Sequence, residues 1–280
     1  MIQDIAPHHF DNAYLPVPPQ PGSYALYFEK STVLLDHNGD REFDFPRFKD
    51  LEALNDDIYH NYTYLFSIDG NAFYLLDHIT VPSPSPFGME NTQFFRTGAP
   101  RHLAFAGITG WQLYLWYESR HYCGRCGAPL RQHETERMMY CDGCGQMEYP
   151  KISPAVIIGV TDGSRLLLSK YNGRTYKKYA LLAGFTEIGE TLEETVKREV
   201  MEEVGLKVTN IRYYKSQPWS FTGTLLAGYF CDLEEPGEIL LEENELALAE
   251  WFEREDIPLE DENFISLTHE MIRYFKAGHC

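Results

Sequence analysis

Apolar and aromatic residues in the first part of the chain occur in short runs separated by turn-forming residues, a pattern typical of strands. The runs at 24–28 and 32–35 predict two short strands. The stretch 62–76 predicts a β-hairpin, because Asp69-Gly70 stands between two apolar and aromatic halves. A longer apolar stretch at 103–117 predicts a helix, which we expect to pack between domains. This region carries no catalytic motif, so it is open to the role of scaffold, dimer surface or substrate wall.

The last part of the chain alternates strand-like and helix-like segments. Runs at 156–160 and 165–168 predict two paired strands with a turn at Asp162-Gly163. The remaining expected elements are a helix from Thr191, strands near Ile211 and at 225–230, and a terminal helix from about Ser266. The pattern predicts an α+β fold in three regions: a β-rich N-terminal domain at 1–118, a compact module at 119–151 and a C-terminal domain at 152–280.

The composition is that of a folded, acidic protein. Of the 280 residues, 44% are hydrophobic and 14% aromatic, which excludes a disordered chain. A formal charge of −18 opposes non-specific binding to nucleic acid, which requires a basic surface. Residues 1–10 lack a basic segment followed by an apolar run, and no apolar stretch has the length of a membrane span. We therefore expect a cytoplasmic protein without membrane association, whose thiols stay reduced, so that paired cysteines are metal ligands before they are disulfides.

Four of the six cysteines form two Cys-x-x-Cys pairs, Cys123 with Cys126 and Cys141 with Cys144, with fourteen residues between the pairs. Each pair can turn two thiolates toward one point, and two pairs supply the tetrahedral ligand set of zinc. The gap is one residue below the usual spacing of about 15–20 residues. Because protein would fill all four ligand positions, we expect a structural zinc ribbon, with a redox dithiol as the alternative.

The stretch 184–206 predicts a loop followed by a helix that is dense in carboxylates. Thr191 and Glu194 form a capping box at the start of the helix, and Gly205 suits a left-handed C-cap. The buried face is marked by valines that recur every four residues, namely Val196, Val200 and Val204.

Glu199, Glu202 and Glu203 follow one another at i, i+3 and i+4, so they share an arc of about 100° of the helix surface. Like charges at this spacing repel each other, and a divalent cation between them reverses the sign of the interaction. Hard oxygen ligands of this kind favour Mg²⁺ or Mn²⁺. Three glutamates by themselves would equally suit an ordinary solvated acidic helix.

The complete spacing from 184 to 206 decides between these two interpretations. It runs Gly, five residues, Glu, seven residues, Arg-Glu-Val, one residue, Glu-Glu, one residue, Gly-Leu. This pattern resembles the box of the Nudix hydrolases, without a substitution. The resemblance implies that the C-terminal domain is a mixed sheet between helices, an α/β/α sandwich. It also implies cleavage of a nucleoside diphosphate that is linked to another group.

The same resemblance assigns roles to individual residues of the box. It implies that Glu199, Glu202 and Glu203 bind the catalytic metal ions. Arg198 would orient these carboxylates by salt bridges, and Glu190 would have a supporting role. The glycines of the box, Gly184 and Gly189, would permit the loop geometry.

Three further features resemble the NADH pyrophosphatase group of the Nudix hydrolases. A four-cysteine ribbon directly precedes the Nudix-like domain, and Tyr-Pro-Lys-Ile-Ser-Pro at 149–154 links the two. The segment 216–224 reads Ser-Gln-Pro-Trp-Ser-Phe-Thr-Gly-Thr, where the group has Ser-Gln-Pro-Trp-Pro-Phe-Pro-x-Ser. Ser220, Thr222 and Thr224 depart from that pattern, and the missing prolines are expected to loosen this loop and blur the substrate preference. The resemblance covers 119–280 well and the first region only loosely.

Membership of this group implies a homodimer that hydrolyses NADH or NAD to nicotinamide mononucleotide and AMP, and some members remove the NAD cap from RNA. It implies that Phe185 and Tyr149 stack on a nucleobase, for which core packing is the alternative role. Glu245 matches a late glutamate that binds metal or acts near it, and a solvated surface residue is its alternative. The other expected substrate-binding residues are Glu136, Ser216, Gln217, Trp219, Phe221 and Ser266.

The expected reaction is metal-assisted hydrolysis of a pyrophosphate bond. Mg²⁺ or Mn²⁺ would neutralise the phosphate oxygens and activate water, and a glutamate would remove the proton. The candidates for this base are Glu199, Glu202, Glu203 and Glu245. Two alternatives stay open: a different substrate such as ADP-ribose or coenzyme A, and a regulator that binds a nucleotide without cleaving it. The complete set of glutamates argues against the regulator, and the acidic composition argues against long contacts with RNA.

Overall fold

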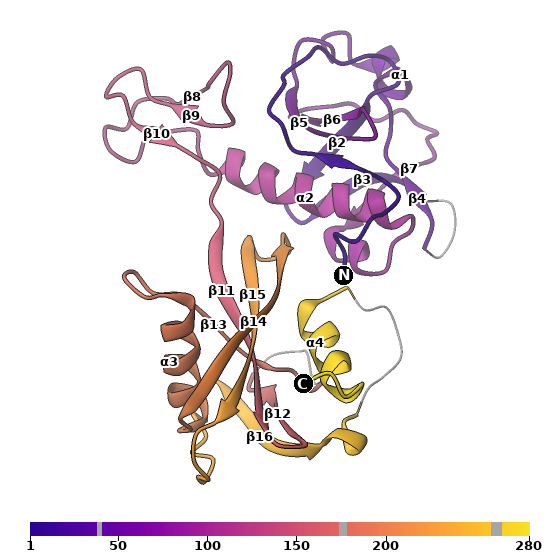
Figure 1. Ribbon diagram of the computed structural model, residues 1–280. Coiled ribbons are helices and arrows are strands. Elements are labelled where there is room, and N and C mark those ends of the chain that lie inside the picture. The colour runs from indigo at the N-terminus through magenta and orange to yellow at the C-terminus, as the bar shows by residue number, and fades with distance from the viewer. Residues whose placement is uncertain (38–40, 174–177, 259–264) are drawn as a thin grey trace. The chain divides into compact units, whose positions relative to one another are not determined.

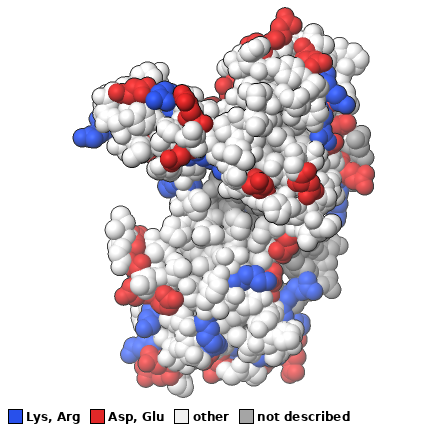
Figure 2. Space-filling model, turned by 45° about the horizontal axis from the view of Figure 1, so that its top comes forward, with Lys and Arg blue, Asp and Glu red and all other residues white. Residues whose placement is uncertain are grey.

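The computed structural model describes residues 1–37, 41–173, 178–258 and 265–280, and the chain divides into two compact units. The N-terminal unit comprises 2–151 together with the turn 220–222. The C-terminal unit comprises Met1, 152–219 and 223–280. Among the helices so described, none combines the length and the apolar character that a membrane span requires. Acidic and basic side chains are interspersed over the molecular face in Figure 2.

The N-terminal unit is built on one mixed sheet of short strands. Its strands are β1 (Phe10–Asp11), β2 (Tyr24–Glu29), β3 (Thr32–His37), β4 (Phe43–Asp44), β5 (Thr63–Ile68), β6 (Asn71–Leu76) and β7 (Phe87–Asn91). Their order is β1-β5-β6-β2-β3-β4, with β7 paired to β3. The helices are α1 (Phe48–Leu51), α2 (Arg101–Glu118) and short 3₁₀ helices at Glu52–Leu54 and Thr92–Arg96.

Helix α2 lies along this unit in Figure 1 and approaches its neighbours closely at two glycines. A Cβ atom on Gly107 would come within 2.2 Å of the Phe95 ring, and one on Gly110 within 2.5 Å of Leu26. The hydrophobic core of the unit therefore reaches the backbone of the helix. The hairpin at 62–76, the strands at 24–28 and 32–35, and the helix at 103–117 are confirmed. That this helix packs between domains stays a prediction.

The segment 119–151 belongs to the N-terminal unit and contains a small antiparallel sheet. Its strands are β8 (Arg131–Gln132), β9 (Met139–Tyr140) and β10 (Met147–Glu148), in the order β10-β9-β8. Side chains tie this segment to the larger sheet. The amide of Gln132 donates to the hydroxyl of Thr63 at 2.7 Å, and the Tyr14 hydroxyl donates to the His133 carbonyl at 3.4 Å.

The C-terminal unit is a mixed sheet between two helices (Figure 1). Its strands are β11 (Ser153–Asp162), β12 (Arg165–Tyr171), β13 (Leu182–Phe185), β14 (Val208–Trp219), β15 (Thr224–Leu233) and β16 (Leu246–Glu253). The order is β14-β15-β11-β12-β16, with β13 paired to β11 and with β11 and β15 parallel. The helices are α3 (Leu192–Val204), α4 (Leu267–Lys276) and a 3₁₀ helix at Arg254–Asp256.

Alternation along the strands divides the core of this unit into two layers. Val156 and Ile158 of β11 pack in the cluster that contains the buried valines of α3. Ile157, which lies between them, packs in the cluster that contains Met271 and Phe275 of α4. The expected α/β/α sandwich is therefore the architecture of this unit.

The pattern of apolar residues predicted most elements of this unit but not all of them. The paired strands at 156–160 and 165–168, the helix from Thr191 and the terminal helix after Ser266 are confirmed. Strands β13 and β16 were not expected. The segment from Ser216 to Trp219, expected as a loop, is the end of strand β14. Pro218 is compatible with this position because β14 is an edge strand of the sheet. On the side of an edge strand that has no neighbouring strand, the N–H that proline lacks has no hydrogen-bond partner to lose.

The C-cap of α3 offers a direct test of this packing. Gly205 has a φ of 69°, and an added Cβ would lie 2.8 Å from the Cβ of Leu240. Gly163 has a φ of 58° with no atom within 4 Å of such a Cβ. We expect Gly205→Ala to lower the free energy of unfolding by about 2 kcal/mol and Gly163→Ala by about 1 kcal/mol, since only the first adds a steric clash to backbone strain. Urea denaturation followed by circular dichroism measures both, and equal losses would mean that the Leu240 contact costs nothing.

Candidate active site and metal centres

The four cysteines of the ribbon converge on one point. Their sulfur atoms all lie within 4.8 Å of one another, with Cys123 Sγ 3.6 Å from Cys144 Sγ and Cys126 Sγ 3.5 Å from Cys141 Sγ. A tetrahedral zinc site with Zn–S bonds of about 2.3 Å places its sulfurs about 3.8 Å apart, so the spacing fits zinc.

Two equivalent turns present these sulfurs. Gly127, with a φ of 75°, donates its N–H to the Cys123 carbonyl, and Gly145, with a φ of 73°, does the same to Cys141. Backbone N–H groups of Cys126 and Arg125 donate to the Cys123 sulfur and lower its pKa to about 7, which favours the thiolate that a metal requires.

Helix α3 begins and ends as its sequence predicts. Thr191 accepts from the Glu194 N–H at 3.2 Å, and Glu194 accepts from the Thr191 N–H at 2.8 Å, which completes the capping box. Gly205 is the left-handed C-cap. This geometry fixes where the glutamates of the helix lie relative to the preceding strand β13.

Arg198 is the centre of the carboxylate cluster. Its Nε donates to Glu190 Oε1 at 2.5 Å and its Nη2 to Glu190 Oε2 at 2.9 Å, a two-pronged ion pair. Its Nη1 reaches Glu199 at 2.8 Å and Glu202 at 2.9 Å. Nη2 also donates to the carbonyl of Phe185 at 2.9 Å, which ties the helix to the end of β13. The guanidinium thus holds three carboxylates and one backbone segment in fixed relation.

This network strongly shifts the pKa of its members. Hydrogen bonds from Arg198, with further ones from the Glu187 N–H and Thr195, lower the pKa of Glu190 to about 2. The same bonds raise the pKa of Arg198 above its ordinary value. Both groups therefore stay charged across the whole physiological range.

Glu199 lies in a cradle that only glycine can leave open. A Cβ on Gly184 would come 1.8 Å from Cδ of Glu199 and within 2.2 Å of both its oxygens. Gly184 lies inside strand β13, so its need for glycine is steric and does not come from a loop conformation. Burial raises the pKa of Glu199, Arg198 opposes that rise, and the charges of Glu202 and Glu245 add to it.

Three further glutamates of the candidate site, Glu202, Glu203 and Glu245, differ in their exposure to solvent. Glu203 is 1% exposed, and both its carboxylate oxygens are shielded from solvent, whereas the Glu202 side chain is 59% exposed. Glu245 lies in the turn before β16, exposed but close enough to Glu199 to act on it electrostatically. Because Glu199 and Glu203 are buried, α3 is not an ordinary solvated acidic helix.

The donor set fits a hard divalent cation such as Mg²⁺ or Mn²⁺. All four side chains offer carboxylate oxygens, and a dication would relieve the repulsion between them. Among the residues that the structure describes, only the cysteines gather three or more ligand atoms within 4.8 Å of one another. In this structure Glu199 and Glu202 are held by their ion pairs with Arg198.

The predicted substrate-binding residues of the C-terminal unit differ in accessibility. Phe185 is 56% exposed at the end of β13, which excludes core packing for it. Ser216 is exposed and Trp219 half-buried on β14. Gln217 is fully buried and joins β14 to the start of α4: its Nε2 donates to the Ile265 carbonyl at 2.7 Å, and its Oε1 accepts from the Leu267 N–H at 2.6 Å.

Ser266 is the N-cap of α4 and accepts from the His269 N–H at 3.4 Å. Gln217 and Ser266 therefore fasten the beginning of this helix. Substrate binding by either residue stays a prediction.

Three predicted substrate-binding residues lie in the N-terminal unit: Tyr149 and Glu136, which are hydrogen-bonded to each other, and the buried Phe221. Tyr149 is 53% exposed, so it is not a core residue, and its hydroxyl donates to Glu136 Oε2 at 3.0 Å. This hydrogen bond raises the pKa of Tyr149. Phe221 is buried, with the guanidinium of Arg96 4.1 Å from the centre of its ring.

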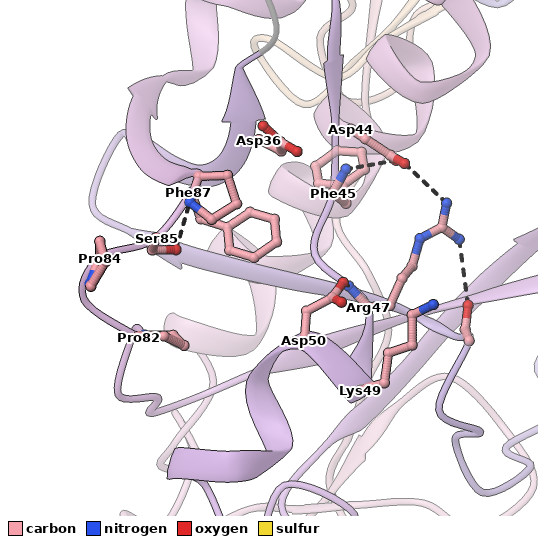
Figure 3. Close-up of a pocket in the computed structure, with 12 residues that line it drawn as sticks. Asp36, Asp44, Phe45, Arg47, Lys49, Asp50, Pro82, Pro84, Ser85 and Phe87 are labelled. Carbon is pink, nitrogen blue, oxygen red and sulfur yellow. Dashed lines mark hydrogen bonds and ion pairs between the residues drawn. The ribbon is translucent and has the colours of Figure 1, made fainter.

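A cavity of about 680 Å³ in the N-terminal unit lies outside all the predicted sites (Figure 3). Three aspartates, two cations, two phenylalanines and a proline-rich segment line it. Its arginine, Arg47, is already committed to Asp44 at 3.2 Å, to the Gly22 carbonyl at 3.4 Å and to the face of the Tyr24 ring at 3.3 Å. No sequence motif pointed to this cavity.

Two family models match adjoining parts of this chain. Residues 151–274 match the NUDIX domain, and residues 119–149 match the NADH pyrophosphatase zinc ribbon domain. The chain contains a Nudix domain behind a zinc ribbon domain of the NADH pyrophosphatase type.

Relatives of known name match about half of the chain. It is 40% identical over 150 residues to the NAD-capped RNA hydrolase NudC of Klebsiella pneumoniae, and 41% identical over 150 residues to that of Citrobacter koseri. Each match covers 54% of this chain and 58% of the relative, so the chain spans less than two thirds of the relatives' length. A NUDIX hydrolase from Nitrosomonas europaea superposes with a TM-score of 0.49 at 25% identity, over 56% of this chain and 92% of that one.

Zinc analysis tests the ribbon. We expect about one zinc ion per chain, and Cys141→Ser should lose most of it because a tetrahedral site loses one of four ligands. Cys231→Ser, a substitution at a buried thiol of the Nudix domain, should keep the zinc. A wild-type protein without zinc and with a Cys126–Cys141 disulfide would contradict the assignment.

The ion pair of Arg198 and Glu190 predicts a dependence of stability on pH. The pKa of Glu190 falls from its ordinary value of 4.5 to about 2 on folding. A depressed pKa stabilises the folded state above the unfolded value and loses this effect as the pH falls toward the folded value. The difference in unfolding free energy between wild type and Glu190→Gln should therefore stay constant above about pH 6 and shrink steadily below about pH 4.5. A difference that does not change with pH would contradict the charged pairing.

Proposed function

We propose that this chain is a metal-dependent hydrolase that cleaves the pyrophosphate bond of NADH or NAD to nicotinamide mononucleotide and AMP. The observation that carries the proposal is the Arg198 network, which holds Glu190, Glu199 and Glu202 beside the buried Glu203. The names of the matched relatives and the matched ribbon domain support the choice of an NAD-type substrate.

Glu199, Glu202, Glu203 and Glu245 would hold Mg²⁺ or Mn²⁺ in this proposal. When bound, such ions neutralise pyrophosphate oxygens and lower the pKa of water. Arg198 holds Glu199 and Glu202 near each other by donating to one oxygen of each carboxylate. The base that accepts the proton of water is one of these four glutamates, and Glu202 and Glu245 have the exposure needed to reach water.

In this proposal, exposed aromatic rings bind the nucleobase of the substrate. Phe185 is exposed at the end of β13, and its own backbone carbonyl accepts a hydrogen bond from Arg198. Tyr149, in the ribbon, is exposed as well. Flat aromatic faces bind nucleobases by stacking, which requires exposure of this kind.

NAD-capped RNA is a second substrate in the proposal. The relatives named above are NAD-capped RNA hydrolases. The charge of −18 and the interspersed charges in Figure 2 favour contacts limited to the capped end over a long RNA track. We further propose a cytoplasmic homodimer, in keeping with the group that the sequence resembles.

Glutamate substitutions on one helix test the metal site. Glu203→Gln should reduce hydrolysis by at least about a hundredfold, because it removes the charge of a ligand without changing its shape. Glu193→Gln, an exposed position on the same helix outside the network, should leave the rate within about twofold. Circular dichroism checks that both variants are folded. Near-wild-type activity in a folded Glu203→Gln protein would rule out Glu203 as a ligand.

A further inference from the structure

The hairpin between β8 and β9 of the zinc ribbon turns two neighbouring side chains in different directions. Glu136 is exposed at its tip, whereas Arg137 is half-buried and Met138 is buried. The tip closes on itself through the His133 N–H, which donates to the Met138 carbonyl at 3.0 Å. Whatever fixes Arg137 therefore also fixes the direction of Glu136.

Arg137 is fixed by backbone and amide oxygens of the larger sheet. Its Nη1 donates to Asn12 Oδ1 at 2.7 Å, and its Nη2 donates to the Asn12 carbonyl at 3.3 Å and to the carbonyl of Leu65. Its guanidinium lies 5.6 Å from the centre of the Tyr14 ring. Burial lowers the pKa of Arg137. In the described part of the chain, no carboxylate is among its hydrogen-bond or ion-pair partners.

A cation buried without a carboxylate loses hydration that oxygen dipoles and an aromatic face only partly replace. The forked guanidinium reaches two different chain segments at once, the N-terminal strand region at Asn12 and strand β5 at Leu65. Lysine, with a single charged nitrogen, cannot span both in the same way. Arg137 therefore sets the register of the hairpin tip more than it stabilises the unit.

The other side of the tip leads to Tyr149. Glu136 accepts the hydrogen bond of the Tyr149 hydroxyl at 3.0 Å, while the tyrosine stays 53% exposed. The hydroxyl end of the ring is thus held, while about half of the residue stays accessible to solvent. A chain of contacts runs from Asn12 and Leu65 through Arg137 to Glu136 and Tyr149.

We propose that Arg137 is a positioning residue for the substrate site: it holds the hairpin tip so that Glu136 fixes Tyr149 in the orientation in which a nucleobase stacks on it. The stacking role of Tyr149 depends on the proposed function. The orientation of Tyr149 depends only on the contacts described above.

Steady-state kinetics with NADH tests the first part. Arg137→Met keeps an unbranched apolar stem but loses the guanidinium fork. Its KM should rise about fivefold with kcat within twofold, the scale of one net hydrogen bond. In a Glu136→Gln background the same substitution should add less than twofold, because the link to Tyr149 is already weakened. Arg131→Ala, which removes an exposed ion pair with Asp142 on the same hairpin, is the matched control and should leave KM unchanged.

Should Arg137→Met fail to fold or lose its zinc, Arg137→Lys carries the test, with an expected rise in KM of about threefold. A wild-type KM in either folded variant overturns the proposal. An equal rise in KM with and without Glu136→Gln overturns it too, since Arg137 would then act only through the general fold.

The ionisation of Tyr149 gives a readout that needs no substrate. In protein labelled at the tyrosine Cζ carbon, the Tyr149 signal is the one of the 19 that disappears in Tyr149→Phe. Its titration midpoint should lie above that of an ordinary tyrosine, because Glu136 accepts its hydrogen bond, and should fall toward the ordinary value in Arg137→Met and in Glu136→Gln alike. An unchanged midpoint in Arg137→Met overturns the positioning role. If the wild type hydrolyses no dinucleotide, the proposed function fails, and this titration still decides on Arg137.

Discussion

The ion pairs of Arg198 are the constraint on which the candidate site depends. One guanidinium holds Glu190, Glu199 and Glu202 and also the carbonyl of Phe185, so it joins the loop, the helix and the end of strand β13. A single planar group with five donors can do this because its donors point in fixed directions. Without it, the carboxylates of α3 would repel one another, and the helix would lose its hydrogen bond to the end of β13.

The packing of α3 against the sheet also positions the glutamates. The valines of α3 bury one face of the helix against β11, and Glu199 lies on the side that faces β13. Gly184 allows the strand to pass so close that Glu199 lies over its Cα atom. The site is therefore a product of close helix–strand packing together with the ion pairs of Arg198.

The sequence predicted the parts of the molecule where local chemistry is strong. The capping box at Thr191, the left-handed Gly205 and the four cysteines each require particular residues at particular spacings, and all appear as expected. It failed where tertiary context decides. Strand β13 is four residues long and contains a glycine, and the polar end of β14 carries Pro218, so neither has a strand pattern of its own. The burial of Gln217 and the contacts of Arg137 depend on segments distant in sequence, and no spacing rule reveals them.

The most direct test of the account is a comparison of substrates with products identified. NADH, NAD, ADP-ribose and NAD-capped RNA would be incubated with the protein and Mg²⁺ or Mn²⁺, and the products separated by chromatography. The account predicts nicotinamide mononucleotide, reduced or oxidised, together with AMP or an RNA with a 5′-monophosphate, as the dominant products. Preferential cleavage of ADP-ribose, or cleavage that does not require a divalent metal ion, would contradict it.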